Sequence, residues 1–78
     1  MQINQSLKRK ILKQVGINVQ LYRRKANISQ EKLALEIGAD RTYISAIEQG
    51  IKSPSLYCLY KIAEKLNVPT KELLDINL

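Results

Sequence analysis

Capping and stopping residues in the middle of the chain restrict its fold more than any other feature of the sequence. Ser29 and Asp40 are residue types that favour the N-cap of a helix, and Gly38 and Gly50 can take the left-handed conformation that ends one. Apolar residues recur between these marks at helical spacing. Residues 29–49 therefore predict two short helices joined by a tight turn, which is the helix-turn-helix pattern.

Three further helices are predicted around this pair, because apolar stripes recur there at helical spacing between residues suited to start or end a helix. No β-strand alternation competes, so the fold class is all-α. Gly16 costs roughly 1 kcal/mol relative to Ala in the first helix, which indicates close approach by another element or a tolerated glycine. The expected elements are a first helix at about 6–26 ended by Asn27, a fourth capped by Ser55 and ended by Asn67, and a fifth capped by Thr70. The expected buried residues are Leu7, Ile11, Val15, Val19, Tyr22, Leu33, Ala34, Ile37, Ile44, Ile47, Leu56, Leu59, Ile62, Ala63, Leu66, Leu73 and Leu74.

A chain of 78 residues is expected to form a single domain, 1–78, with a thin core and with residues 1–5 frayed. Dimerisation is a common way for so small a domain to gain stability. The region of about 55–78 is more apolar than a small monomer needs and carries no net charge, which predicts a two-fold dimer interface there. The expected interface residues are Tyr57, Tyr60, Leu74, Ile76 and Leu78.

The net charge of +6 is confined to one part of the chain. Residues 1–52 contain ten Lys or Arg and four Asp or Glu, whereas residues 53–78 contain three of each. Such a concentration of positive charge is expected of a surface that faces phosphates. The alternative is that the charge serves only to keep the protein soluble. The run Lys8-Arg9-Lys10, with Lys13, has the same two interpretations: a clamp on DNA or a solvated helix face.

The sequence lacks the residues on which catalysis, metal binding and phosphate-loop binding usually depend. The chain has no histidine, a single cysteine and no glycine-rich phosphate loop among three glycines, so an enzyme, a metal site, a cofactor and a small-molecule ligand are not expected. Cys58 alone cannot form an intramolecular disulfide, which favours a reducing compartment. No apolar run approaches the ~20 residues that span a bilayer, so a cytoplasmic protein without a membrane segment is expected.

The outward face of the third helix points to nucleic acid. Thr42, Ser45, Ala46 and Gln49 stand at i, i+3, i+4 and i+7, and all but Gln49 are small. Short side chains allow a helix to lie deep in a major groove, which is about 12 Å wide. Arg41 lies at the N-terminal end of this helix, where recognition helices present their base-reading residues.

The segments VGINVQLYRR, SQEKLALEIGADRTYISAIEQG and PSLYCLYKIAEKLNV resemble the Cro/repressor-type helix-turn-helix, or XRE, family. The resemblance covers residues 15–74 and implies a compact five-helix lambda-repressor-like DNA-binding domain. RTYISAIEQG followed by PSL is similar to the restriction–modification controller proteins, a subgroup of the family. Asn27 replaces a glycine often found in the family, and Gln20 replaces a frequent basic residue, which removes one expected phosphate contact.

Base contacts are expected from Arg41, Thr42 and Ala46. The planar guanidinium of Arg41 matches guanine O6 and N7, and the alternatives for it are the DNA backbone or Asp40. Thr42 can contact a base edge or a thymine methyl group, and Ala46 only the latter.

Phosphate contacts are expected from residues around the recognition helix. The resemblance implies that Gln30 holds the DNA backbone and braces this helix, and that Arg23 and Glu48 form a partly buried ion pair which orients it. For Tyr43, packing against the first helix is an alternative role. The expected phosphate-contacting residues are Gln30, Tyr43, Ser45, Gln49, Lys52, Ser53 and Arg23.

Together these features predict a dimeric, sequence-specific transcription regulator of double-stranded DNA. Its recognition helix, 41–49, is expected in the major groove of a roughly palindromic operator, and a controller protein is the narrower hypothesis. An antitoxin-type module that binds a partner protein and regulates its own synthesis is the main alternative. A helical interaction module with no DNA role is another.

Overall fold

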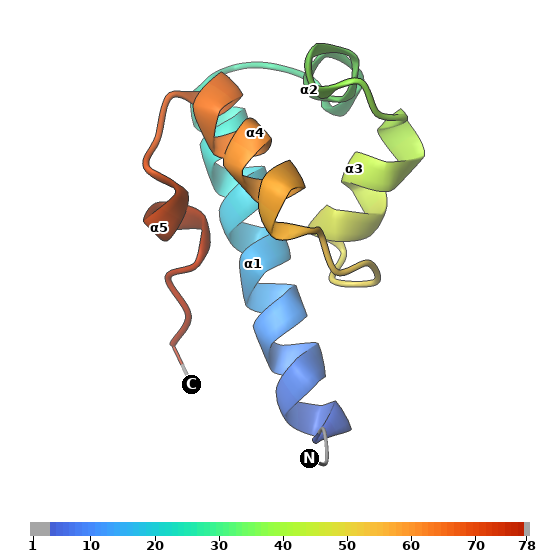
Figure 1. The fold of residues 1–78 in the computed structure, drawn as a ribbon, viewed down its shortest axis with the longest axis vertical. Coiled ribbons are helices and arrows are strands. Elements are labelled where there is room, and N and C mark those ends of the chain that lie inside the picture. The colour runs from blue at the N-terminus through green and yellow to red at the C-terminus, as the bar shows by residue number, and fades with distance from the viewer. Residues whose placement is uncertain (1–3, 78) are drawn as a thin grey trace.

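The computed structural model describes residues 4–77, which form five α-helices and no β-strand (Figure 1). The longest helix, α1, lies along the long axis; α4 crosses it, α2 and α3 lie on one side and α5 on the other (Figure 1). The all-α, five-helix prediction is confirmed. No described helix is both long and apolar enough to cross a membrane. The helices are α1 (Gln5–Lys25), α2 (Gln30–Ile37), α3 (Arg41–Glu48), α4 (Leu56–Leu66) and α5 (Thr70–Leu73).

Most helix ends lie where single residues predict them. The Ser29 hydroxyl accepts a hydrogen bond from the Lys32 backbone N–H at 3.0 Å, and the hydroxyl of Ser55 caps α4 in the same way at 3.0 Å. These bonds satisfy backbone donors that a helix start leaves free. The predicted left-handed stops are also confirmed, at Asn27, Gly38, Gly50 and Asn67.

Two predictions about helix starts are wrong, and a third is confirmed only for the position of the cap. Gln5 is already helical because the Asn4 side chain accepts from the Leu7 backbone N–H at 3.2 Å, so fraying does not include residues 4 and 5. Residues 1–3 lie outside the described part of the chain. Asp40 occupies the N-cap of α3, but its side chain makes no capping bond. Pro69, and not Thr70, is the N-cap of α5, because the Pro69 carbonyl accepts from the Glu72 backbone N–H.

The core is built from the stripes that the sequence predicts, with three exceptions. Leu56 is 75 % exposed because it lies in the first turn of α4, beyond the cover of other helices. Leu7 is exposed because the N-terminal part of α1 extends past the bundle (Figure 1), and Leu74 because Leu73 takes the core position. Ile11 and Tyr22 are only partly buried. The buried apolar residues are Val15, Val19, Leu33, Ala34, Ile37, Ile44, Ile47, Leu59, Ile62, Ala63, Leu66 and Leu73.

Helix α1 approaches the end of α3 very closely at Gly16. A Cβ at this position would lie 2.6 Å from the carbonyl oxygen of Glu48, a distance that real Cβ atoms essentially never show. The obstacle is backbone and cannot rotate away. Of the two interpretations of Gly16, close approach by another element is confirmed.

Polar side chains of α1 hold the C-terminal segment on the opposite side. The Asn18 amide donates to the backbone carbonyls of Leu73, at 3.1 Å, and Asp75, at 2.9 Å, and Gln14 donates to the Asn18 oxygen at 3.2 Å. The Tyr22 hydroxyl donates to the Glu72 carboxylate at 3.1 Å. These bonds give a short helix and an irregular segment a defined place along α1.

Candidate nucleic-acid interface

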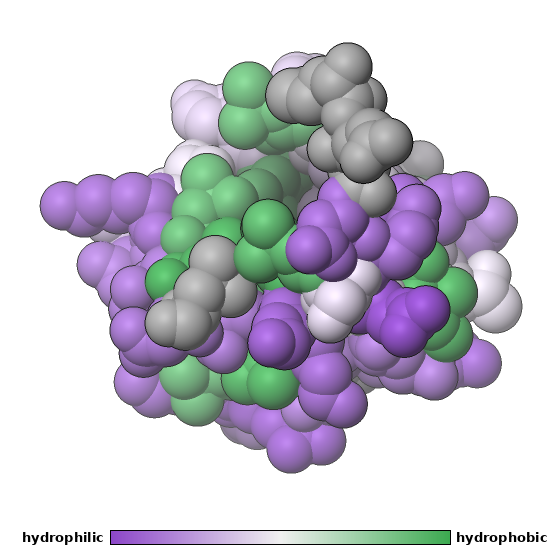
Figure 2. All heavy atoms as spheres, turned by 90° about the horizontal axis from the view of Figure 1, so that it is seen from below, coloured by the Kyte–Doolittle hydropathy of each residue, from purple (hydrophilic) through white to green (hydrophobic). Residues whose placement is uncertain are grey.

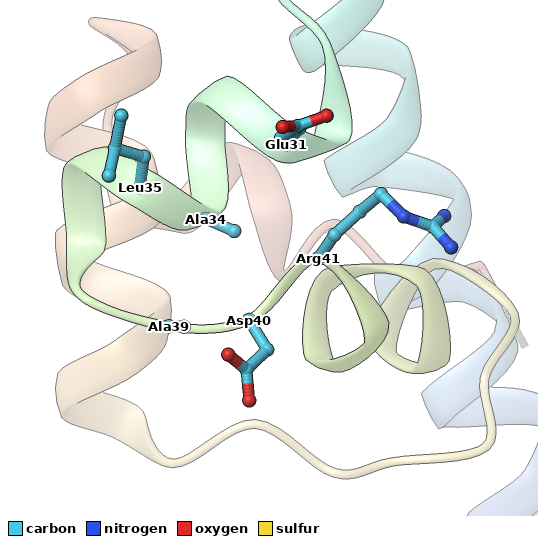
Figure 3. Close-up of a pocket in the computed structure, with 6 residues that line it drawn as sticks. All are labelled: Glu31, Ala34, Leu35, Ala39, Asp40 and Arg41. Carbon is cyan, nitrogen blue, oxygen red and sulfur yellow. The ribbon is translucent and has the colours of Figure 1, made fainter.

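Helices α2 and α3 form the predicted helix-turn-helix and stand clear of α5 (Figure 1). An open pocket of about 410 Å³ separates them at the turn, and its walls come from both helices (Figure 3). Arg41 lies on its rim, and its guanidinium points away from Asp40 (Figure 3). The lining residues are Glu31, Ala34, Leu35, Ala39, Asp40 and Arg41.

A buried ion pair joins α1 to the end of α3. Arg23 Nε donates to Glu48 Oε2 at 2.6 Å and Arg23 Nη2 to Glu48 Oε1 at 3.0 Å, with both residues less than a tenth exposed. The third guanidinium contact is from Nη1 to the Ile28 carbonyl at 2.8 Å. Because Arg23 is buried and three of its five N–H groups donate to protein acceptors, the geometry favours its orienting role over a phosphate contact.

The Glu48 carboxylate also fixes the orientation of the side-chain amide of Gln30, the first residue of α2. Gln30 Nε2 donates to Glu48 Oε1 at 2.9 Å, which leaves Gln30 Oε1 as an acceptor on the outer side. Arg41 Nη1 donates to that oxygen at 3.2 Å. The amide of Gln30 therefore connects the buried ion pair to the exposed guanidinium, and Arg41 is held by Gln30. No ion pair joins Arg41 to Asp40 within residues 4–77.

The other residues expected at base edges lie on the outer face of α3. Thr42 is exposed and Ala46 half-buried, while Ile44 and Ile47 on the inner face are fully buried. Because Asp40 does not cap α3 with its side chain, the backbone N–H groups of Arg41 and Thr42 have no side-chain acceptor among residues 4–77. The exposed start of α3 thus presents both backbone N–H donors and the side-chain donors of Arg41 and Thr42.

The residues expected at phosphates divide into two groups. Lys52 and Ser53 are exposed in the loop after α3, and Gln49 is exposed at its end, where Gln49 Nε2 donates to Ser45 Oγ at 2.8 Å. Tyr43 is half-buried against the core and lies beside Ser55 and Cys58 at the start of α4. Burial raises the pKa of Tyr43, and the adjacent Cys58 thiol raises it further.

Two polar residues of α1 had no role that we predicted from the sequence. Gln20 Nε2 donates to Glu48 Oε1 at 3.4 Å, so a fourth side-chain donor group approaches this carboxylate. Helical spacing could have predicted this contact, because Gln20 lies on the same face of α1 as Gly16 and Arg23, the face toward α3. Asn18 is the second missed residue, and its acceptors lie more than fifty positions away in the chain.

The residues expected at a dimer interface belong to α4 and the C-terminal segment. Tyr57 and Tyr60 of α4 are exposed, as is Leu74, whereas Ile76 is half-buried against the core. Leu78 lies outside the described residues. Figure 2 shows hydrophobic side chains gathered at the lower end of the molecule, between the start of α1 and the C-terminal segment.

Two short helices at a tight turn, an outer helix with a small-residue face and a buried brace behind it define a domain of the helix-turn-helix class. The helix-turn-helix family profile matches residues 19–73. The chain belongs to this family, in its Cro/repressor (XRE) branch, and the recognition made from its motifs is confirmed.

Named relatives include controllers and regulators. The chain is 53 % identical over 51 residues to control protein C.BamHI of Bacillus amyloliquefaciens, a match that covers 65 % of this chain and 63 % of the relative. It is 37 % identical over 62 residues to the HTH-type transcriptional regulator SlrR of Bacillus subtilis, over 78 % of this chain and 41 % of SlrR. The chain thus spans less than two thirds of the length of these two relatives.

Solved structures share the fold. The hypothetical transcription factor NHTF from Neisseria has a TM-score of 0.81 at 33 % identity, over 88 % of this chain and 79 % of that one. The restriction-modification controller protein C.AhdI from Aeromonas hydrophila has a TM-score of 0.77 at 34 % identity, over 80 % of this chain and 90 % of that one. Together with C.BamHI, this likeness confirms the similarity to restriction–modification controller proteins.

Proposed function

We propose that this protein is a sequence-specific regulator of transcription that binds double-stranded DNA through α3. The observation that carries the proposal is the start of α3, where Arg41 is exposed but held by Gln30, which is in turn held by Glu48. A guanidinium fixed in this way loses little conformational freedom when it binds a guanine. Names of relatives such as C.BamHI favour the narrower role of a restriction–modification controller.

Sequence readout is assigned to Arg41, Thr42 and Ala46 on the outer face of α3. Affinity comes mainly from phosphate contacts around this face, which fix the register of the protein on the duplex. The amide of Gln30 has a second N–H for a phosphate in addition to the one that it donates to Glu48. The remaining phosphate-contacting residues are Ser45, Gln49, Lys52 and Ser53, with lesser roles for Tyr43 and Arg23.

The functional unit is a homodimer that joins through Tyr57, Tyr60, Leu74 and Ile76. An isologous interface there would place two copies of α3 in successive major grooves, about 34 Å apart, on a roughly palindromic operator. The exposed side chains of Tyr57, Tyr60 and Leu74 support this arrangement, because none of them belongs to α2 or α3. A second copy would cover them.

Selection of bound sites from random duplex DNA tests the readout. We expect one preferred sequence with two related half-sites. Arg41→Ala should weaken binding to that operator by about 1–3 kcal/mol and relax the preference at one base pair in each half-site. Arg41→Lys should restore affinity better than selectivity, because it keeps the charge but loses the planar fork.

Operators changed one base pair at a time give the decisive comparison. If the parent protein and Arg41→Ala show the same base preferences, Arg41 is a phosphate anchor and the readout belongs to Thr42 and its neighbours. A parent protein that enriches no sequence would refute the proposed function.

Sedimentation at micromolar concentration tests the dimer. The parent protein should sediment as a dimer, and Leu74→Lys should shift it toward monomer, because a charge would be buried at the interface. Leu35→Lys is the matched control, since Leu35 is 80 % exposed on α2 and outside the proposed interface. Equal behaviour of the two variants would place the interface elsewhere.

A further inference from the structure

The start of the chain is strongly and uniformly basic. Residues 1–30 contain seven Lys or Arg and no Asp or Glu, so that Glu31 is the first acidic residue of the sequence. Within residues 4–77 the ion pairs are Arg23–Glu48 and Lys32–Glu36. The remaining basic side chains near the start of α1 are all exposed and have no carboxylate partner in this part of the chain: Lys8, Arg9, Lys10 and Lys13.

Two of these four residues lie on the stripe of α1 that faces α3. Gly16, Gln20 and Arg23 of that stripe all contact Glu48, through backbone approach, amide and guanidinium. Toward the N-terminus the stripe continues at helical spacing with Lys13 and then Arg9. Since α1 rises 1.5 Å per residue, the Cα atoms of these two residues lie about 6 Å apart along one side of the helix.

The loop after the recognition helix rests directly on this part of α1. A Cβ at Gly50 would lie 2.9 Å from the Cα atom of Lys13, so the two backbones are in contact. Lys52 and Ser53 follow in the same loop and are exposed. Figure 1 shows that α1 continues past this loop and beyond the other helices. Basic groups therefore run from the loop onto the free part of α1 without an acidic side chain between them.

We propose that the N-terminal part of α1 is a DNA-backbone arm, in which Arg9 and Lys13 bind phosphates next to those contacted by the loop at residues 50–53. The inference rests on the proposed function, since the same duplex occupies both surfaces. Lys10 and Lys8 flank the stripe and add attraction without a fixed contact. The arm contributes affinity and salt dependence but no base preference, because phosphates are alike in every sequence.

The test compares two double variants that lower the net charge equally. Arg9→Ala/Lys13→Ala removes the arm, and Lys65→Ala/Lys71→Ala is the matched control in exposed positions of the net-neutral C-terminal third. Affinity for the selected operator is measured over a range of salt concentrations. Each phosphate contact adds about 0.9 to the slope of log K against log salt, so the arm variant should lose about 1.8 for each bound protomer, or about 3.6 for the proposed dimer. The control should keep the slope of the parent protein.

Phosphate-ethylation interference locates the contacts on the operator. Phosphates whose ethylation blocks the parent protein should cease to matter for the arm variant, while its preference for each base pair stays the same. Ala favours helix, so α1 should remain folded, and circular dichroism checks this.

The outcomes separate the arm from the proposed function. A parent protein that binds its operator selectively, together with an arm variant that matches the control in slope and interference pattern, overturns the arm alone. An altered base preference in the arm variant also overturns it, because Arg9 or Lys13 would then read sequence. A parent protein that binds no duplex overturns both.

Discussion

Helix α1 is joined to its neighbours by two polar junctions of different chemistry. On one side, the Glu48 carboxylate of α3 receives hydrogen bonds from Arg23, Gln20 and Gln30, and its closest contact is an ion pair at 2.6 Å. On the other side, Asn18 donates to two backbone carbonyls of the C-terminal segment, without any formal charge. Figure 1 shows these two neighbours on opposite sides of α1.

The difference shows what each junction is built to do. A buried ion pair is a weak source of net stability, because desolvation offsets most of the attraction, but its geometry is strict. Such strictness suits the junction behind α3, which in the proposed function presents side chains to DNA in one orientation. A neutral amide satisfies the backbone carbonyls of an irregular segment at lower cost. That suits a segment whose task is to stay in place.

Removal of the charged partner should have the largest effect. Glu48→Ala leaves the Arg23 guanidinium buried without its counter-ion and should lower the free energy of unfolding by about 3–5 kcal/mol in the absence of DNA. Glu36→Ala is the control, because its pair with Lys32 spans 3.9 Å at the surface and should contribute at most about 0.5 kcal/mol. Chemical denaturation of both variants gives the comparison. Equal midpoints would mean that Glu48 behaves as a surface residue.

Steric crowding of the same junction should come next. Gly16→Ala places a Cβ against the carbonyl of Glu48, and backbone shifts that relieve such overpacking cost about 1–3 kcal/mol. The better helix propensity of Ala, about 1 kcal/mol, opposes this loss. We expect a net decrease in thermal stability together with weaker operator binding, because α3 has to move. A variant more stable than the parent protein would show that the helices can separate without cost.

Disruption of the neutral junction should cost less. Asn18→Ala leaves the carbonyls of Leu73 and Asp75 without their donor, and we expect a loss of about 1–3 kcal/mol. Limited proteolysis should also cleave the C-terminal segment faster. Gln14→Ala is the control, because among the described residues the Gln14 side chain hydrogen-bonds only to the Asn18 side chain and donates to no part of the segment itself. Unchanged cleavage in Asn18→Ala would mean that packing of Leu73 alone retains the segment.

The smallest expected effect is the pH dependence of the second contact to α5. The hydrogen bond to Glu72 raises the pKa of Tyr22 above its ordinary value of 10.0. The folded state therefore favours the protonated phenol, so this stabilisation is present below pH 10 and is lost as the pH rises through the folded-state pKa. The free energy of unfolding should fall more steeply above pH 10 in the parent protein than in Tyr22→Phe. Parallel profiles would assign no such role to Tyr22.

The predictable part of the fold was the part that single residues determine. Ser29 and Ser55 start helices, and Asn27 and Asn67 end them, because each satisfies or permits a backbone geometry within its own turn. The predicted burial of Leu56 was wrong, because its exposure depends on where the neighbouring helices end. The local sequence pattern predicts the apolar stripe of a helix, but it does not predict how much of that stripe the other helices cover.

In the candidate site, too, features that depend on local pattern were predicted and contacts between distant residues were not. Helical spacing placed Thr42 and Ala46 on the outer face of α3, and the family resemblance paired Arg23 with Glu48. The resemblance implied that Gln30 braces the recognition helix, but neither source predicted that it would bridge Glu48 and Arg41, because the bridge brings the start of α2 to both ends of α3. The junction at Asn18 was missed for the same reason, since its acceptors are 55 and 57 positions away.

The bridge through Gln30 has a consequence for how this protein can acquire a new operator. Arg41 is connected through Gln30 to the carboxylate that holds α1 against α3, so a substitution at Gln30 also disturbs the scaffold, and one at Arg41 removes a hydrogen-bond donor from Gln30. The side chains of Thr42 and Ala46 have no hydrogen-bonded partner within residues 4–77 and can change without that penalty. Divergence of binding preference, in nature or in a selected library, should therefore begin at positions 42 and 46. A change at position 41 should more often be accompanied by one at position 30, because the two side chains are hydrogen-bonded.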